Sequence, residues 1–139
     1  MAGVHFSFDN LEQLVSLSIG IADRLDENRA ESFTVLYCDL SMLADTVIKN
    51  SLEQVLRSSD AIVNSDKDYF FVLPYTDKYG AQIVKEMFDE FFGETTEAYA
   101  VSYPRDGETP KAVLTELQDG VSKAYENDLK CLDRFTLHL

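Results

Sequence analysis

Several residue types are scarce in this chain of 139 residues, which has no tryptophan, two cysteines, three prolines and six glycines. With 45% hydrophobic, 12% aromatic and 27% charged residues, the chain is expected to fold into a globular protein. Cys38 and Cys131 form no CxxC pair and have no histidine beside them, which argues against a zinc site. We expect two buried free thiols, as in a reducing compartment.

Basic residues are also scarce: 12 lysines and arginines stand against 25 acidic residues, and the formal net charge is −13. Phosphate backbones and anionic membrane surfaces are bound by clustered positive charge, so nucleic acid is excluded as a partner and an anionic membrane surface is disfavoured. No apolar run approaches the roughly 20 residues that span a bilayer, and no signal-peptide pattern is present. We therefore expect a cytoplasmic protein without membrane insertion.

The length predicts a single domain with a real core. The patterns predict an N-terminal segment and helix over 1–31, which either pack on the body or extend from it, followed by a domain over 32–139. Apolar periodicity, turn residues and capping residues give the order of elements. Asp9 or Asn10 is expected to cap the first helix and Thr76-Asp77 the third, and Thr109-Pro110 is expected to open the fourth. Helices are expected at about 10–28, 43–58, 78–92 and 110–127, and strands at 32–40, 61–63, 69–73, 97–103 and 132–139, with a turn at 64–68.

This order is a ferredoxin-like β-α-β-β-α-β arrangement with an extra N-terminal helix and a C-terminal α-β unit. The predicted class is α/β (α+β), with a central, mostly antiparallel sheet flanked by helices. Residues 69–73 are apolar at almost every position, which is typical of a strand buried on both faces. The helix over 78–92 is strongly amphipathic. Its apolar face, expected in the core, consists of Ala81, Ile83, Val84, Met87, Phe88, Phe91 and Phe92.

Two stretches resemble a known family. Residues 60–81, DAIVNSDKDYFFVLPYTDKYGA, are similar to the signature hairpin of GGDEF domains, the fold of diguanylate cyclases. Residues 100–109, AVSYPRDGET, are similar to the late strand of that family and its Pro-x-Asp-Gly-Glu-Thr turn. The resemblance covers the chain from about Thr34 onward and implies a GGDEF-like fold in a bacterial signalling protein.

The five positions of the family motif depart from it here. They are occupied by Asp66, Lys67, Asp68, Tyr69 and Phe70. The resemblance implies that two glycines let GTP lie against the turn in active members, whereas Asp66 and Lys67 fill that space here. Tyr69 replaces the second acid, and the guanine-reading segments expected after Ser41 are missing. We therefore expect a degenerate motif and no enzymatic activity.

One metal site is suggested by the same comparison. Asp39, at the end of the first predicted strand, matches the first metal-binding aspartate of the family, and Asp68 matches the first motif acid. Carboxylates at adjacent strand ends suit Mg²⁺. The residues alone also allow a simpler interpretation, in which both are solvated acids of an acidic protein. No other cofactor is expected.

One ligand site is suggested just before the hairpin. Arg57-Ser58-Ser59-Asp60 stands at the offset of the family's Arg-x-x-Asp inhibitory site, which implies binding of cyclic di-GMP by Arg57 and Asp60. An arginine fork reads guanine O6 and N7, and a carboxylate accepts from the N–H edge of guanine. The alternative is an arginine at a helix end and an aspartate that caps a strand entrance. The expected function is a catalytically inactive regulatory module that senses cyclic di-GMP. The alternatives are a protein-interaction or dimerisation domain without nucleotide and, least favoured, an active cyclase.

Overall fold

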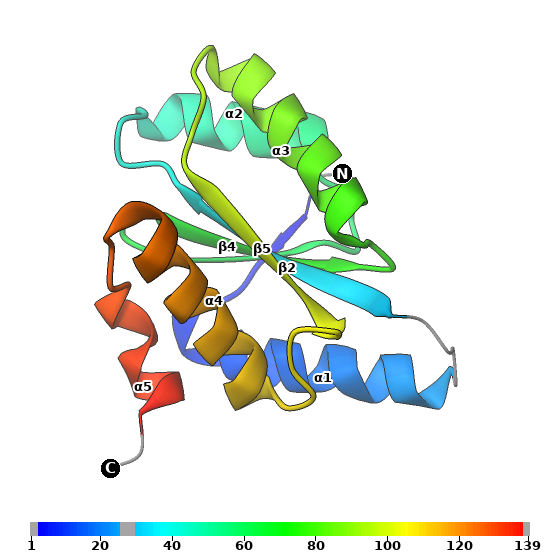
Figure 1. Ribbon diagram of the computed structural model, residues 1–139. Coiled ribbons are helices and arrows are strands. Elements are labelled where there is room, and N and C mark those ends of the chain that lie inside the picture. The colour runs from blue at the N-terminus through cyan, green and yellow to red at the C-terminus, as the bar shows by residue number, and fades with distance from the viewer. Residues whose placement is uncertain (1–2, 26–29, 138–139) are drawn as a thin grey trace.

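The computed structural model describes residues 3–25 and 30–137. Its centre is a five-stranded sheet with strand order β1-β3-β4-β2-β5, and helices cover both faces (Figure 1). The strands are β1 (Val4–His5), β2 (Glu31–Asp39), β3 (Ala61–Ser65), β4 (Asp68–Pro74) and β5 (Ala98–Pro104). The helices are η1 (Phe8–Asn10), α1 (Leu11–Arg24), α2 (Asp45–Val55), α3 (Lys78–Phe92), α4 (Pro110–Tyr125), η2 (Lys130–Leu132) and α5 (Asp133–Thr136).

The sheet is mostly antiparallel. Strand β2 pairs antiparallel with β4 on one side and with β5 on the other, and β3 pairs antiparallel with β4. Only the short β1, which the sequence did not predict, runs parallel to its neighbour β3. This architecture confirms the predicted mixed α/β class with helices on both faces of the sheet.

Each face of the sheet has its own apolar core, because successive side chains of a strand point to opposite faces. In β2, Val35 and Tyr37 face the layer of α1, α4 and α5, while Leu36 and Cys38 face α2 and α3. Figure 1 shows these two helical layers on either side of the sheet. Residues Phe70 to Leu73 of β4 are buried on both faces, as their apolar run predicted.

Helix α1 packs on the body of the domain. Its residues Leu11 and Val15 are fully buried in the core that α4 also covers. The predicted cap was Asp9 or Asn10; both residues lie in the short η1, and Asn10 is at the N-cap position of α1. The predicted end of that helix, at 26–28, lies outside the described residues.

Helix α4 approaches β5 closely because of Gly120. A Cβ at this glycine would lie 2.2 Å from the ring of Tyr99. A glycine costs about 1 kcal/mol of helix propensity relative to alanine in the middle of a helix. Because Gly120 has no side chain, the Tyr99 ring packs directly against helix α4.

The predicted C-terminal strand over 132–139 is wrong. The chain forms η2 and α5 there, and residues 138–139 lie outside the described part. The apolar residues of this segment are buried from a helical conformation instead: Leu132 and Phe135 point into the core of the α1/α4 face. A short apolar run of this kind fits either structure until its packing partner is known.

The structure also differs from three smaller expectations. The turn of the hairpin is shorter than 64–68, because Ser65 pairs with Asp68 and leaves only Asp66 and Lys67 between the strands. Both cysteines are free, but Cys131 is only partly buried. On α3, Phe88 and Phe92 are in the core as predicted. The other large members of the predicted core face, Ile83, Met87 and Phe91, are exposed by 42%, 39% and 51%.

Candidate functional site

The predicted site residues fall into two groups at opposite ends of β4. The motif positions and Asp39 lie at the hairpin end, where β4 begins with Asp68. Arg57 and Asp60 lie near Pro74, where β4 ends. Strand β4 is seven residues long from Asp68 to Pro74, so the two groups are about 20 Å apart along the strand. They are separate sites.

The hairpin turn is closed by its own side chains. Asp66 has a positive φ of 53°, a backbone conformation that aspartate tolerates better than most residues. Its carbonyl accepts a hydrogen bond of 2.8 Å from the Asn64 side chain. The Lys67 ammonium reaches across to the start of α2, where it donates to the Leu43 carbonyl at 2.5 Å and pairs with Asp45 at 3.0 Å. The Lys67 side chain therefore covers the α2 side of the turn.

Asp39 and Asp68 are brought together, as predicted. They are directly paired across β2 and β4, and their positions in the alternating pattern place both side chains on the α4 face. Asp39 accepts from the Ser41 N–H at 3.0 Å, and Asp68 accepts from the Tyr37 hydroxyl at 2.7 Å. Burial and the nearby Asp39 charge raise the pKa of Asp68, although the hydrogen bond from Tyr37 opposes this rise.

The pair supplies two carboxylates. Among the described residues, no group of three or more histidine, cysteine, aspartate or glutamate side chains is placed to hold a metal ion. Tyr69, at the position of the second motif acid, lies on the opposite face, where it stacks on Phe71 with ring centroids 6.1 Å apart. Magnesium at Asp39 and Asp68 stays a prediction that rests on these two oxygen donors.

Arg57 and Asp60 bind each other. The Asp60 carboxylate accepts from the Arg57 backbone N–H at 2.8 Å and from the Arg57 guanidinium at 2.9 Å. The same guanidinium nitrogen donates to the Pro74 carbonyl at 2.8 Å and to the Thr76 hydroxyl at 3.2 Å. The Asp60 side chain is only 3% exposed, whereas that of Arg57 is 52% exposed. Asp60 therefore closes the loop before β3, and Arg57 is the member of the pair that solvent reaches.

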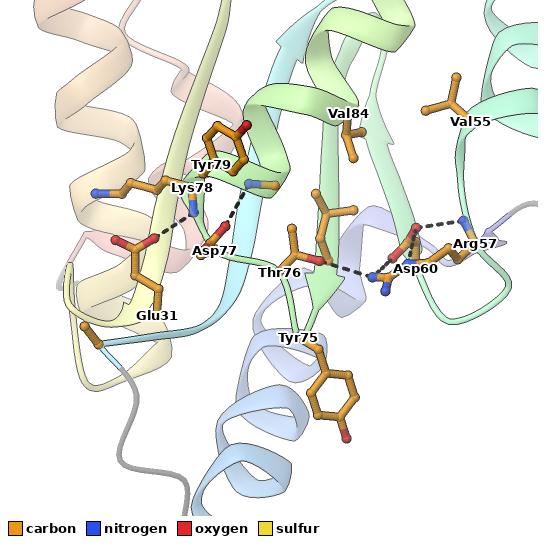
Figure 2. A pocket seen from close by; sticks show the side chains of 13 residues that line it. Glu31, Val55, Arg57, Asp60, Tyr75, Thr76, Asp77, Lys78, Tyr79 and Val84 are labelled. Atoms are coloured by element: carbon orange, nitrogen blue, oxygen red, sulfur yellow. Dashed lines mark hydrogen bonds and ion pairs between the residues drawn. The ribbon is translucent and has the colours of Figure 1, made fainter.

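Arg57 lines an open groove with a volume of about 840 Å³ (Figure 2). The groove lies between the end of α2 and the start of α3. Val55 and Val84 lie on its upper side, and Tyr75 points away from Arg57. Its size is that of a small-molecule site. It is lined by Ala30, Glu31, Val55, Arg57, Asp60, Leu73, Tyr75, Thr76, Asp77, Lys78, Tyr79, Gly80 and Val84.

Two carboxylates already bind the N-terminus of helix α3 in this groove. Asp77 caps α3 by accepting from the Gly80 N–H at 2.7 Å, and Glu31 accepts from the Lys78 N–H at 2.6 Å. The Lys78 ammonium is paired with Asp106 at 2.6 Å. The positive end of the helix dipole is thus satisfied from within the protein. Arg57 remains the groove's half-exposed positive group.

Sequence patterns pointed to part of this groove. The Thr-Asp pair before α3 predicted the Asp77 cap, and the Arg-x-x-Asp pattern predicted Arg57 and Asp60. Glu31 was missed because it is distant in sequence and reaches Lys78 only through the pairing of strands in the folded sheet. No local signal marks it.

Comparison with known proteins gives structural likeness only. No protein-family model matches the sequence, and no curated protein matches it either. A sensory box/GGDEF family protein from Caulobacter crescentus is similar in structure, with a TM-score of 0.66 and 14% identity, over 87% of this chain and 93% of that one.

A second solved structure that is similar to this chain is that of LapD from Vibrio cholerae, which comprises an S helix, a GGDEF domain and an EAL domain and is bound to c-di-GMP. The TM-score is 0.50 and the identity is 15%, over 81% of this chain. The match spans 32% of that protein's length. Because both proteins contain the GGDEF fold and cover most of this chain, the chain has a GGDEF-like fold.

Proposed function

We propose that this chain is a catalytically inactive GGDEF-like regulatory module. The observation that carries this proposal is the closed hairpin turn, where Lys67 spans from the turn to Leu43 and Asp45. The resemblance implies that a nucleotide lies against this turn in active members of the family. The proposal is that the Lys67 side chain, held by a carbonyl and a carboxylate, blocks that place in this chain.

The charges at this end of the sheet also favour an inactive module. Phosphoryl transfer depends on positioning the phosphates and neutralising their charge. Tyr69 has a phenol where the family motif has its second carboxylate, and it lies on the face of the sheet opposite to Asp39 and Asp68.

Incubation of the protein with GTP and Mg²⁺ tests this half of the proposal. We expect no cyclic dinucleotide by chromatography, even at high protein concentration and long times. A matched variant, Lys67→Ala, removes the side chain that covers the turn and is also expected to be inactive, because Tyr69 remains. Product formed by the unmodified chain would overturn the proposal.

The finer proposal is that the module senses cyclic di-GMP at the Arg57 groove. Its support is the half-exposed Arg57 guanidinium on the wall of a groove of suitable size. Asp60 is nearly buried and is occupied by Arg57, so it orients the guanidinium and does not itself read a base. In this proposal the solvent-exposed part of the Arg57 guanidinium contacts guanine.

Calorimetry with cyclic di-GMP tests the ligand. We expect binding in the micromolar range that Arg57→Ala abolishes. Arg134→Ala is the matched control, because Arg134 is also 52% exposed and also pairs with an aspartate, Asp9. Binding that survives Arg57→Ala, or that Arg134→Ala weakens equally, would contradict the assignment of the site.

A second candidate function is an interaction domain that binds no nucleotide. One observation favours it: Arg57 already donates to Asp60, Pro74 and Thr76, so its role in the loop is complete without a ligand. Absence of binding heat at high micromolar cyclic di-GMP, with an unchanged melting temperature, would select this candidate over the sensor.

A further inference from the structure

Helix α3 carries an exposed row of large apolar side chains. Tyr79, Ile83, Met87 and Phe91 follow one another at intervals of four residues, so they form one ridge along the helix. Their exposed fractions are 76%, 42%, 39% and 51%. We call these four residues the α3 ridge. The core of this face is filled without them, by residues such as Phe88 and Phe92 on the inner side of the same helix.

The ridge has the length of a helix-binding surface. Phe91 lies twelve positions after Tyr79, which corresponds to about 18 Å along the helix axis. Single exposed apolar residues are ordinary on protein surfaces, whereas a continuous apolar row indicates an interaction site. Two of the four are aromatic, the residue type that most often dominates binding energy at interfaces.

Acidic residues border the ridge on one side. Glu86 lies one position before Met87 and three after Ile83, and Glu90 stands in the same relation to Phe91 and Met87. Both glutamates are exposed. The neighbouring lysine, Lys85, is paired with Asp89 and is largely buried. Within residues 3–25 and 30–137, neither Glu86 nor Glu90 forms an ion pair, so the border is negative on a chain whose net charge is −13.

This charge decides between the surfaces that could cover the ridge. A second copy of the chain would bring its own Glu86 and Glu90 against the first pair, and like charges facing each other are destabilising. An anionic membrane surface would be repelled by the same glutamates. A helix whose apolar face is flanked by lysine or arginine complements both the apolar row and the acidic border.

We propose that the α3 ridge is the docking surface for an amphipathic helix with basic flanks, supplied by a partner protein or a partner domain. Glu86 and Glu90 select the basic partner, and Met87 and Phe91 provide the apolar anchor. The inference goes beyond the proposed regulatory function, because these residues belong neither to the hairpin turn nor to the Arg57 groove. Among the four ridge residues, Tyr79 also lines the Arg57 groove, so it is left out of the test.

Three synthetic helical peptides of about 18 residues, roughly 27 Å long, provide the probe. The first has a leucine face flanked by lysines, the second has the same face flanked by glutamates, and the third keeps the lysines but replaces the leucines by serines. Fluorescence anisotropy with the full chain measures binding. We expect the first peptide alone to bind, with an affinity that falls as salt is raised.

Variants of the chain locate the binding surface. Phe91→Ser and Met87→Ser should each weaken the first peptide about tenfold, equivalent to ~1.4 kcal/mol. Leu17→Ser is the matched control, because Leu17 is 60% exposed on α1, away from the ridge. The double variant Glu86→Lys with Glu90→Lys should exchange the preference, so that the glutamate-flanked peptide binds better than the lysine-flanked one.

Several results would overturn the inference. Equal binding of the first and third peptides would show attraction by net charge alone, and an equal loss in Leu17→Ser would place the site elsewhere. No binding of the first peptide would also refute it. A dimer in sedimentation velocity that Phe91→Ser dissolves would assign the ridge to a second copy. Loss of cyclic di-GMP binding in Arg57→Ala leaves all these outcomes unchanged, so this inference and the proposed function fail separately.

Discussion

At the scale of single residues, the pair of Asp68 and Tyr37 sets the properties of the hairpin end. The Tyr37 ring is buried in the core, where it lies 5.3 Å from the ring of Phe70, and its hydroxyl donates to Asp68. Burial and the negative charge of Asp68 raise the pKa of Tyr37, so it remains a hydrogen-bond donor throughout the physiological range. The arrangement holds Asp68 on the α4 face of the sheet.

Asp68→Asn is expected to stabilise the protein at neutral pH. The folded state raises the pKa of Asp68, mainly through burial, so folding favours its protonated form. That contribution is fully present below the unfolded pKa and is lost as pH rises through the folded pKa. The amide still accepts from Tyr37 and has no charge to bury. Because the site is partly exposed, the gain at neutral pH should be less than about 1 kcal/mol.

Urea unfolding at neutral pH and at acidic pH, below the ordinary aspartate value of about 4, measures this effect. Asp119→Asn is the control, since Asp119 is an exposed acid of α4. We expect the difference between Asp68→Asn and the unmodified protein to shrink toward acidic pH. A difference that is the same at both pH values would contradict a role for the Asp68 charge.

At the scale of elements, β5 is an edge strand whose open side is blocked at both ends. Near its start, the Tyr125 hydroxyl donates to the Ala98 carbonyl at 2.8 Å and accepts from the Ala98 N–H at 3.3 Å. Near its end, Asp106 accepts from the Ser102 N–H at 2.8 Å through its carboxylate and donates to the Ser102 carbonyl from its backbone. Unpaired strand edges invite pairing with other chains. These contacts protect this edge.

Tyr125→Phe is expected to make the protein self-associate. The variant removes only the hydroxyl, and so opens one end of β5 with a loss of about 1 kcal/mol of stability. Tyr103→Phe is the matched control, because it loses a hydrogen bond to Asp23 of 2.7 Å but leaves the edge covered. Light scattering at rising protein concentration should increase for Tyr125→Phe alone. Equal scattering by both variants would show that the hydroxyl does not guard the edge.

At the scale of the whole molecule, α1 is part of the core that closes one side of the sheet. It shares that side with α4 and α5, and Val15 is completely buried there. Among the described residues, no helix is long and apolar enough to cross a membrane. Because Leu11 and Val15 of α1 are buried in this core, α1 contributes to the stability of the same body that carries the groove and the α3 ridge.

Val15→Asp is expected to destabilise the protein by about 3 kcal/mol or more, because it buries an unpaired charge. Leu17→Asp is its partner experiment on the same helix, where the side chain is 60% exposed, and it should change stability by about 0.5 kcal/mol or less. Denaturant titration measures both. If the two variants had equal effects, α1 would not be docked on the sheet as the structure has it.

The sequence alone determined the elements whose signals are local. The helical periodicity of 78–92, the helix starts at Thr76-Asp77 and Thr109-Pro110, and the apolar run of β4 all have the predicted structures. The ferredoxin-like order β-α-β-β-α-β followed from them, and β2 to β5 with α2 and α3 have this order. These features depend on residues close together in the chain, which is why pattern and propensity were sufficient.

Only the tertiary structure decided which partner each side chain meets. Alternation and periodicity could not tell that Ile83, Met87 and Phe91 lie outside the core, because α3 is apolar on more than one side. The pattern Arg-x-x-Asp could not tell whether Asp60 faces a ligand or Arg57. Such outcomes depend on contacts between residues distant in sequence. For example, Pro74 and Thr76 accept hydrogen bonds from the Arg57 guanidinium only once β3 and β4 are paired.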